Sequence, residues 1–403
     1  MDAFGRELEQ AGEYVSIQCG ASAPNIPTSS KARVRAARPF LLTPEELVKF
    51  AMMAFNAGNG RNPADVYQEN LWQARYAEEL GFDAVWLTEH HFSDYALLGD
   101  PTLFAAVIAE RTERIRIGTA VMVLPVHNPI RVAENGAFVD ILSAGRFDLG
   151  VGRGYQPKEF EGFQVPMDRS QDILDESLEV IRRLWTQETV DFEGEFYQLH
   201  DVRLLPRPVQ DPHPPVWLAA VSPKTFEVAG AKGQAILTSP NFTPIPTIEA
   251  NFDAYRAALT ANAHDPLRYE YPVMQQVYVG ADHDAGYERP REHAMRYYES
   301  LGRLLPKEGD IVSSDYEFYK KVERNVADLR YENLYRTGVS FGSSEEVVAR
   351  IQNLADVVGM TYFIGWFNFG GLPHREVVES MERFASEVMP HFAGQRAGIK
   401  GMV

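Results

Sequence analysis

The sequence predicts an α/β protein whose fold is a (β/α)8 TIM barrel with insertions. Short apolar runs typical of strands alternate with helical patterns about eight times along the chain. The run Val85-Trp86-Leu87 has no polar face, as in a parallel strand that is covered on both sides. An open, doubly wound parallel sheet is the alternative fold, because it alternates strands and helices in the same way.

The expected elements follow one another in a regular order. The strands are expected at 47–55, 83–88, 115–124, 146–151, 216–220, 235–238, 273–279 and 362–367. The helices carry apolar residues at helical spacing, so that one stripe of each faces the strands. Their stripes or spans lie at 71–80, 101–112, 129–143, 173–185, 223–232, 247–262 and 377–388. Gly81 ends the first helix as a C-cap residue would, and Pro101 suits the first turn of the second.

Residues 47–392 are expected to form one barrel domain. Residues 1–46 lack periodic apolar patterning, which predicts an extension that is flexible or laid along the surface. Two insertions interrupt the alternation. The segment 189–215 combines a small hairpin with a proline-rich run, and the segment 281–340 is longer than one crossover needs. Residues 393–403 form a C-terminal tail.

Composition and charge restrict the class of protein. A formal net charge of −17 argues against a nucleic-acid partner, because phosphates would be repelled except near a small basic cluster at 31–38. No apolar stretch approaches the roughly 18 residues needed to span a membrane, and the N-terminus lacks the order of a signal peptide. The single cysteine, Cys19, excludes an intrachain disulfide and fits a reducing cytoplasm. We therefore expect a cytoplasmic enzyme.

Three ionisable residues, Glu89-His90-His91, directly follow the strand expected at 83–88. In a parallel barrel the carboxyl ends of the strands carry the chemistry, and histidine exchanges protons near neutral pH. Because adjacent residues on a strand point to opposite faces, we expect His90 to face the barrel mouth and His91 to support it. Two structural histidines bonded to loop carbonyls are the alternative. No metal site is expected, since the sequence has neither a helical HExxH spacing nor a cysteine cluster.

Other expected strand ends suit a flat or phosphorylated ligand. Small residues at 118–120 let a ligand approach the backbone, although tight packing against the next helix explains them equally well. Arg153 lies among the glycines of 150–154, whose backbone amides are accessible, and its guanidinium suits a phosphate. Ser222 suits the cap of a helix whose free amides hold an anion, and Thr225 could add a hydroxyl contact. An ordinary helix cap is the alternative.

Together these segments resemble the bacterial luciferase-like, flavin-dependent monooxygenase family over about residues 47–392. The resemblance is carried by 81–92, 97–101, 118–120, 123–125, 145–147, 153–154, 215–217 and 388–390. It implies a (β/α)8 barrel that binds reduced FMN at the carboxyl ends of its strands. It also implies that dioxygen is activated as a flavin hydroperoxide.

The resemblance implies roles for residues at matching positions. His90 matches the family's catalytic histidine, and Glu89 and His91 complete the expected catalytic group. Ala120-Val121 matches a non-proline cis peptide against which the flavin ring stacks. Glu159 matches an acidic residue near the flavin.

The phosphate site is implied in the same way, with one departure. Arg153, Ser222 and Thr225 match residues that hold the FMN phosphate. Gln171 occupies the position of a second phosphate-binding arginine, and Arg169, two residues earlier, is the candidate replacement.

The resemblance implies a two-component monooxygenase that receives reduced FMN from a separate flavin reductase. Its substrate is expected to be a small apolar organic molecule, such as an aldehyde or ketone. His90 is expected to act as general acid or base, and 281–340 to close over the site as a lid. An apolar or aromatic substrate is suggested by residues that are expected to line the pocket or equally to fill the barrel core: Met53, Phe55, Tyr155, Trp366 and Phe367.

Two other functions fit the same fold. One is a deazaflavin-dependent oxidoreductase that transfers hydride and does not activate oxygen. The other is a flavin-binding subunit without turnover of its own. The resemblance implies a homodimer, the common assembly of the family, with a heterodimer as the alternative. Light emission is not implied.

Overall fold

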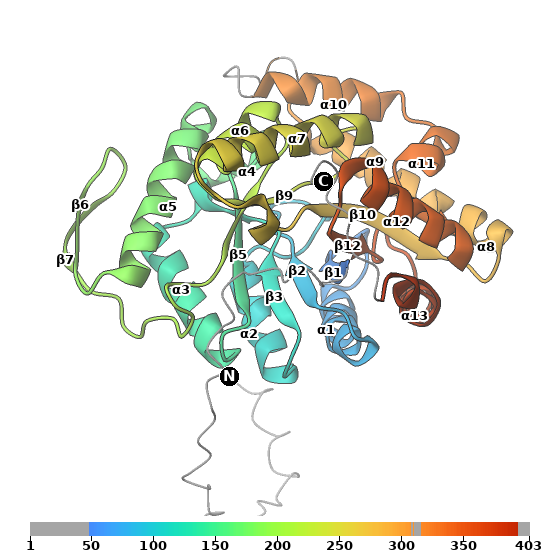
Figure 1. Ribbon diagram of the computed structural model, residues 1–403, viewed down its shortest axis with the longest axis horizontal. Helices are drawn as coiled ribbons and strands as arrows, with labels where there is room; N and C mark the ends of the chain where they lie inside the picture. The colour runs from blue at the N-terminus through green and yellow to red at the C-terminus, as the bar shows by residue number, and fades with distance from the viewer. Residues whose placement is uncertain (1–47, 308, 310–315, 394–403) are drawn as a thin grey trace, which may run out of the picture. The chain divides into compact units, whose positions relative to one another are not determined.

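The structure is a computed structural model that describes residues 48–307, 309 and 316–393 (Figure 1). The extension expected at 1–46 lies outside the described residues, as does nearly all of the tail expected at 393–403. Among the described residues, no helix combines the length and the apolarity that crossing a membrane requires.

Eight parallel strands form the barrel in the described part of the chain, which confirms the predicted fold class. They are β1 (Lys49–Ala54), β2 (Ala84–Leu87), β3 (Arg116–Thr119), β5 (Phe147–Gly152), β8 (Val216–Ala219), β9 (Ala235–Leu237), β10 (Pro272–Val279) and β12 (Tyr362–Trp366). The strands pair in the order β10-β12-β1-β2-β3-β5-β8-β9. The Met274 N–H donates to the Thr238 carbonyl at 2.9 Å, which links β10 to the end of β9 and closes the barrel.

The register of the strands brings their carboxyl ends level. Leu87, the last residue of β2, pairs with Ala54 of β1 and with Thr119 of β3. The residues that follow each of these strands therefore emerge at the same end of the barrel. This is the end at which the sequence predicted the functional residues.

Four short strands lie outside the barrel order. They are β4 (Met122–Val123), β6 (Val190–Glu193), β7 (Gln198–Val202) and β11 (Ser340–Gly342). Strands β6 and β7 form an antiparallel hairpin that stands beside α5 (Ser170–Thr186) in Figure 1. The single strand expected at 115–124 is instead β3 and β4, because the ladder with β2 ends at Thr119 whereas β4 pairs with β5.

Helices surround the barrel, and several begin at a side-chain cap followed by proline. Asn62, Asp100 and Asn128 cap α1 (Pro63–Leu80), α2 (Pro101–Arg111) and α3 (Pro129–Leu142) in this way. Gly81 ends α1 with a φ of 89°, as the sequence predicted. The remaining helices of the outer layer include α6 (Pro223–Ala231), α7 (Ile245–Ala261), α12 (Ser344–Val358) and α13 (His374–Arg383).

Further helices lie in and near the expected insertions. The segment 281–340 contains α8 (His283–Glu288), α9 (Arg291–Leu304), α10 (Glu317–Ala327) and α11 (Tyr331–Thr337). Neither α12 nor the short α4 (Pro157–Phe163) was predicted from the sequence. The start of α12 does carry a recognisable signal, because Ser343 and Glu346 form a capping box.

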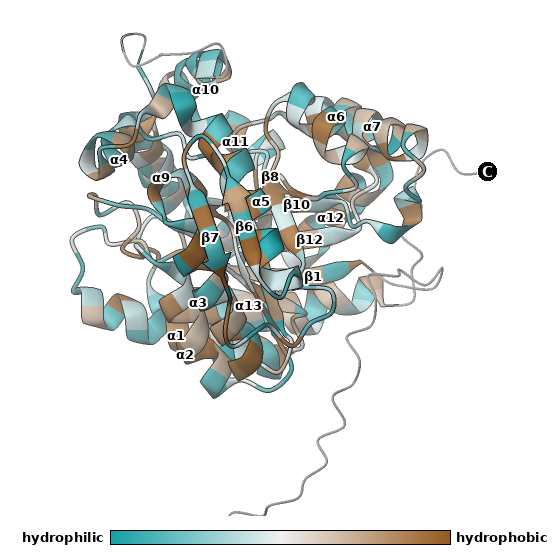
Figure 2. Cartoon of the chain, turned by 90° about the vertical axis from the view of Figure 1, so that its left-hand side faces the viewer, coloured by the Kyte–Doolittle hydropathy of each residue, from teal (hydrophilic) through white to brown (hydrophobic). Residues whose placement is uncertain are grey.

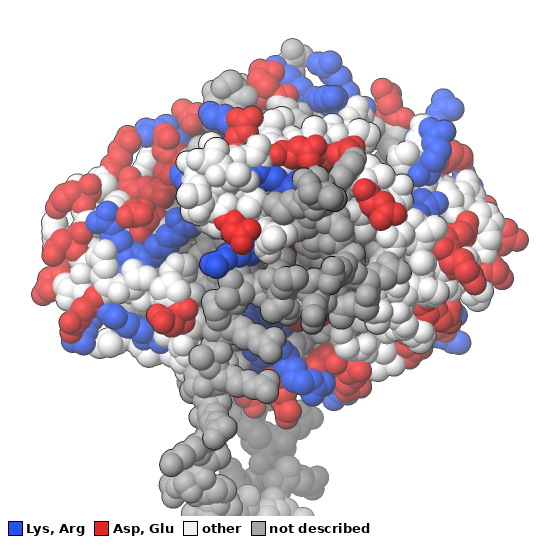
Figure 3. Space-filling model, in the orientation of Figure 1, with Lys and Arg blue, Asp and Glu red and all other residues white. Residues whose placement is uncertain are grey.

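The surface of the described residues carries charges of both signs and an exposed hydrophobic group. On the face drawn in Figure 3, basic side chains are interspersed with acidic ones. Whether the chain avoids nucleic acid stays a prediction from its net charge. Figure 2 shows hydrophobic residues along α2. Four hydrophobic side chains of α2 and α3 are exposed: Leu103, Val107, Phe138 and Leu142.

Candidate active site

A cavity of about 820 Å³ lies at the carboxyl ends of the barrel strands. Its size falls in the range of about 300–1,000 Å³ that is common for small-molecule sites. Predicted site residues that line the cavity are His90, Ala120, Val121, Arg153, Glu159, Ser222 and Thr225. Glu89 borders the cavity, but its side chain has 0% exposed surface. His91 is outside the lining of this cavity.

His90 follows the end of β2, and its ring sits between two hydrogen-bonding partners. The Nε2 atom of the Gln156 amide lies 2.9 Å from His90 Nδ1, and Glu159 Oε1 lies 3.4 Å from the same nitrogen. An amide nitrogen only donates, so Gln156 pairs with an unprotonated Nδ1, whereas the carboxylate of Glu159 pairs with a protonated one. Both protonation states of the ring therefore have a partner. This arrangement suits a group that gains and loses a proton.

Gln156 was not singled out by the sequence analysis. It stands between Arg153 and the first residue of α4, so it belongs to the loop that follows β5. Its side chain is buried at the barrel mouth and is held next to the ring of His90. The signal in the sequence that could have identified Gln156 is a polar residue three positions after Arg153, in the loop that follows a predicted strand.

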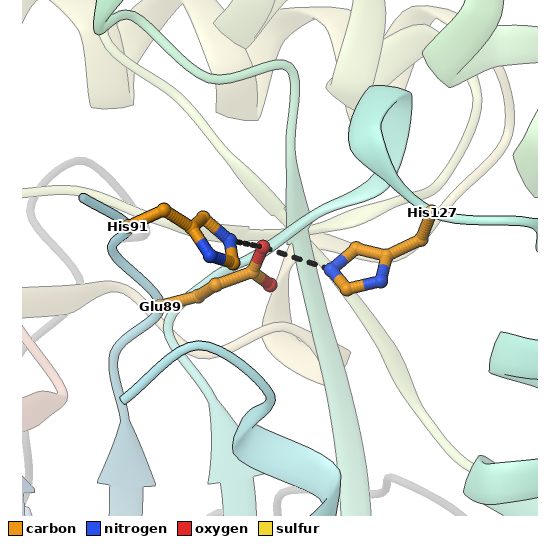
Figure 4. Close-up of side chains that lie close together, drawn as sticks. All are labelled: Glu89, His91 and His127. Atoms are coloured by element: carbon orange, nitrogen blue, oxygen red, sulfur yellow. Dashed lines mark hydrogen bonds and ion pairs between the residues drawn. The ribbon is translucent and has the colours of Figure 1, made fainter. Parts of the chain in front are cut away.

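Glu89 holds a cluster of groups behind the cavity wall (Figure 4). Its Oε1 accepts hydrogen bonds from His91 Nε2 and His127 Nε2, both at 2.8 Å. Its Oε2 accepts a hydrogen bond from the Val123 N–H at 3.0 Å. The carboxylate therefore ties the end of β2 to the start of α3 through His127 and to β4 through Val123.

The two histidines at Glu89 have different origins. His91 belongs to the predicted Glu89-His90-His91 group, and its ring points to Glu89 instead of lining the cavity. His127 follows the segment 123–125 and was missed by the sequence analysis, although an ionisable residue after a strand was the relevant signal. His90 lines the cavity and His91 does not, but strand alternation is not the reason, because both residues lie in the loop after β2.

The cluster sets the protonation of its members. Burial alone would raise the pKa of Glu89, but the hydrogen bonds from His127 and His91 hold this pKa below its ordinary value. Burial alone would lower the pKa of His127, but the hydrogen bond to Glu89 and its negative charge raise it. Glu89 is thus kept ionised although its side chain is removed from solvent.

The same three residues could each offer one ligand atom to a cation. Their ligand atoms lie within 4.8 Å of one another. The two N···O distances of 2.8 Å are those of hydrogen bonds between the histidines and the carboxylate. The expectation of no metal site stays a prediction.

A second wall of the cavity contains the Ala120–Val121 peptide, which is cis. Glycines of β5 make room for this segment. A Cβ atom on Gly150 would lie 1.8 Å from the Thr119 carbonyl oxygen, and one on Gly152 would lie 2.7 Å from Val121 Cγ2. These glycines therefore allow the backbones to approach closely. Gly118 has a different reason, because a Cβ there would lie 2.3 Å from the Trp86 ring, which favours the packing explanation.

A third part of the cavity carries positive charge and hydroxyl groups. The Arg153 guanidinium lies 4.4 Å from the centre of the Tyr316 ring. Ser222 is the N-cap of α6, and its Oγ lies 2.9 Å from Thr225 Oγ1. The positive end of α6 thus lies in the same cavity wall as Arg153, although Pro223 has no N–H and the Thr225 N–H donates to Ser222 Oγ. This end of the cavity can hold an anion.

Arg169, the candidate for a second phosphate-binding arginine, lies away from the cavity. Arg169 pairs with Asp172 at 3.0 Å and with Glu195 at 2.8 Å, and it is outside the lining of the cavity. Gln171 lines the cavity, and so does Lys224, which stands between Ser222 and Thr225 in the sequence.

The fold and the cavity together describe a parallel barrel with a small-molecule site at the carboxyl ends of its strands. Residues 48–361 match the family of luciferase-like monooxygenases, and the chain belongs to this family. It is therefore an enzyme, a luciferase-like, flavin-dependent monooxygenase, as the sequence predicted.

Individual relatives agree with this assignment. The chain is 28% identical to the oxygenase component of flavin-dependent trigonelline monooxygenase from Acinetobacter baylyi, over 81% of this chain and 90% of that protein. It is 28% identical to an alkanal monooxygenase alpha chain from Photorhabdus luminescens, over 78% of this chain and 89% of that protein. It is 30% identical to 4-hydroxyprotoasukamycin monooxygenase from Streptomyces nodosus, over 84% of this chain and 91% of that protein.

Solved structures are similar over most of the chain. Monooxygenase RslO1 from Streptomyces bottropensis has a TM-score of 0.73 at 29% identity, covering 85% of this chain and 99% of that one. The oxygenating constituent of 3,6-diketocamphane monooxygenase from Pseudomonas putida, in complex with FMN, has a TM-score of 0.72 at 19% identity, covering 86% of this chain and 98% of that one. An F420-dependent secondary alcohol dehydrogenase has a TM-score of 0.68 at 21% identity, covering 86% and 99%. At these lower identities the similarity concerns the fold alone.

The Glu89 cluster generates a prediction about pH. The lowered pKa of Glu89 stabilises the fold above about pH 4.5, and this contribution is lost as pH falls through the lowered pKa. The raised pKa of His127 stabilises the fold below about pH 6.5, and this contribution is lost as pH rises through the raised pKa. We expect Glu89→Gln to lower the free energy of unfolding by about 3 kcal/mol, with the largest loss between these two pH values.

Urea unfolding of both proteins from pH 4 to pH 9 measures this difference. NMR titration of the imidazole signals gives a second readout, in which the pKa of His127 should fall once the carboxylate is gone. An equal loss of stability at every pH, with an unchanged pKa of His127, would contradict the role assigned to Glu89.

Proposed function

We propose that this protein is the oxygenase component of a two-component monooxygenase that uses reduced FMN and dioxygen to oxygenate a small apolar organic substrate. The observation that carries the proposal is one cavity lined by His90, the Ala120–Val121 cis peptide, Arg153 and Ser222. A proton-exchanging group, a flat wall of small residues and an anion site are thereby available to one ligand. An aldehyde or a ketone is the substrate type that we expect.

The donor set of the cavity fits FMN. Arg153, the hydroxyls of Ser222 and Thr225, and the positive end of α6 would hold the phosphate. The ring would lie against Ala120 and Val121, and the close approach of Val121 to β5 depends on the glycine at position 152. Glu159 borders the same cavity. When bound in its reduced form, FMN supplies the two electrons with which dioxygen is activated.

His90 would act as the general acid or base at the cavity wall. With Nδ1 unprotonated and held by Gln156, its Nε2 carries the ring proton and can donate it. After uptake of a second proton, Nδ1 can donate to Glu159. Glu89 and His91 would position this segment without touching the reacting atoms, because the Glu89 side chain has 0% exposed surface.

The proposed reaction also defines a partner. One oxygen atom of dioxygen enters the substrate and the other leaves as water, while reduced FMN is oxidised to FMN. A separate flavin reductase would return the cofactor to its reduced form. The trigonelline monooxygenase relative is likewise named as an oxygenase component.

A homodimer is proposed on the exposed apolar face of α2 and α3. Its members are Leu103, Val107, Phe138 and Leu142, with exposed fractions of 67%, 39%, 54% and 44%. The two helices pack against each other, so that these side chains lie on adjoining elements. A face of this kind is stabilised when a second copy covers it.

Oxygen uptake tests the catalytic proposal. We expect wild-type protein with chemically reduced FMN to consume oxygen in step with substrate oxygenation. His90→Ala should lower the coupled rate by about 10²–10⁴-fold, because general acid–base catalysis is lost. His200→Ala, which alters an exposed histidine of the β6–β7 hairpin, serves as the control.

Other outcomes of the same experiment distinguish the alternatives. Hydride transfer to or from a deazaflavin, without oxygen uptake, would favour the deazaflavin-dependent enzyme. Tight FMN binding without coupled uptake in any variant would favour the flavin-binding subunit. F420-dependent proteins among the structures of the same fold make the first comparison worthwhile.

Flavin binding tests the anion site separately. We expect Arg153→Met to raise the Kd for FMN by about 10–100-fold, because a charge-assisted hydrogen bond to the phosphate is lost. The Kd for riboflavin, which lacks the phosphate, should change little. Arg169→Met is the matched control, since Arg169 is outside the cavity lining and pairs with Asp172 and Glu195. Equal weakening of both flavins by Arg153→Met would rule out a phosphate contact.

Light scattering in solution tests the homodimer. We expect a molar mass twice that of the chain for the wild type and a monomer for Phe138→Glu, because the new charge would be buried in the apolar interface. Leu267→Glu, which changes another exposed apolar residue, should remain dimeric. A monomeric wild type would refute this proposal and leave the catalytic one unaffected.

A further inference from the structure

One part of the cavity lining consists of aromatic rings from many elements, called here the aromatic wall. Its members are Phe55, Tyr95, Tyr155, Tyr297, Tyr319 and Trp366. They come from the segments after β1, β2 and β5, from α9 and α10, and from the last residue of β12. The wall therefore joins the barrel mouth to helices of the 281–340 segment.

The rings of the aromatic wall support one another. Phe55 lies 4.6 Å from Trp366 and 5.0 Å from Tyr95, measured between ring centres. Tyr297 lies 4.7 Å from Trp366, and its hydroxyl accepts a hydrogen bond from the Tyr95 hydroxyl at 2.9 Å. These separations are those of favourable aromatic pairs, so the wall is fixed before a ligand arrives.

A second pair of rings extends the wall from β5 to α10. Tyr155 and Tyr319 are stacked, with ring centres 5.4 Å apart and an interplanar angle of 13°. Tyr155 is half-buried, so that it offers more surface to the cavity than the other members. Tyr319 is 7% exposed, so most of the ring surface that this pair offers to a ligand belongs to Tyr155.

The aromatic wall adjoins the proposed acid–base residue. The His90 ring lies 4.8 Å from the Tyr95 ring and 6.2 Å from the Tyr155 ring. A molecule packed on the wall would consequently lie beside His90. Burial raises the pKa values of Tyr95 and Tyr155, so both phenols stay neutral at physiological pH.

We propose that the substrate is a planar aromatic molecule held by the aromatic wall and that Tyr319 of α10 helps to select it. This inference rests on the proposed function. A planar ring system gains stacking with the fixed rings and loses little conformational freedom on binding. A long flexible chain gains no stacking and must give up rotational freedom at every bond. The wall thus favours rigid planar molecules over unbranched ones of equal size.

A matched set of probes tests this inference by binding. The set is 2-naphthaldehyde, its decahydro derivative and undecanal, which share one carbonyl group and the same number of carbon atoms. They differ in planarity and flexibility. With FMN present, we expect 2-naphthaldehyde to bind at least about tenfold more tightly than undecanal, with the saturated bicycle weaker than the aromatic one.

Variants of one position separate selection from folding. Tyr319→Leu should reduce the preference for 2-naphthaldehyde to about twofold, whereas Tyr319→Phe, which keeps the ring, should retain the preference. Tyr335→Leu is the control, because Tyr335 belongs to another aromatic cluster on α11 and is outside the cavity lining. The Kd for FMN should be alike in all these proteins, which shows that the cavity is intact.

Several results would overturn the inference. They are equal affinities for the three probes, tighter binding of undecanal, no binding of 2-naphthaldehyde, and an unchanged preference in Tyr319→Leu. Oxygen uptake is measured in parallel to keep the two proposals apart. Uptake coupled to undecanal but not to 2-naphthaldehyde would sustain the monooxygenase and refute the aromatic preference. Tight binding of 2-naphthaldehyde without coupled uptake would sustain the aromatic preference and refute the monooxygenase.

Discussion

The buried carboxylate of Glu89 is the contact on which the arrangement of the site depends. One of its oxygens takes two imidazole N–H groups, and the other takes the backbone N–H of Val123. A charge without exposed surface is tolerated only where such partners replace water. Because those partners belong to the end of β2, to β4 and to the start of α3, the charge fixes three neighbouring segments at once. His90 is next to Glu89 in the sequence, and the Ala120–Val121 peptide directly precedes β4, so both belong to segments that this carboxylate holds.

Much of the fold could be predicted because it depends on local patterns. Apolar runs located the eight barrel strands, and Gly81 and Pro101 marked ends of helices where the structure has them. The short α4 and the separation of β3 from β4 were missed, because seven residues carry little periodicity and pairing with β5 is a tertiary choice. The family could also be recognised, since its strand-end segments lie in the sequence as continuous runs.

The site was predictable residue by residue only where the chain itself brings groups together. Glu89, His90 and His91 are adjacent in the sequence, so their common location needed no tertiary information. His127 and Gln156 reach the same region from 38 and 66 residues away, and only the barrel brings them there. The position of Arg169 outside the cavity lining likewise depends on tertiary structure. Its carboxylate partner Glu195 stands on the β6–β7 hairpin segment, which no local pattern connects with it.

The two partners of His90 Nδ1 have a mechanical consequence. Because Gln156 and Glu159 both approach this nitrogen, the imidazole keeps its place whether or not the nitrogen carries hydrogen. No rotation of the ring and no rearrangement of solvent has to accompany the change, so little reorganisation energy is added to the barrier. For the proposed monooxygenase, such a fixed imidazole would exchange a proton with a bound ligand without waiting for a structural adjustment.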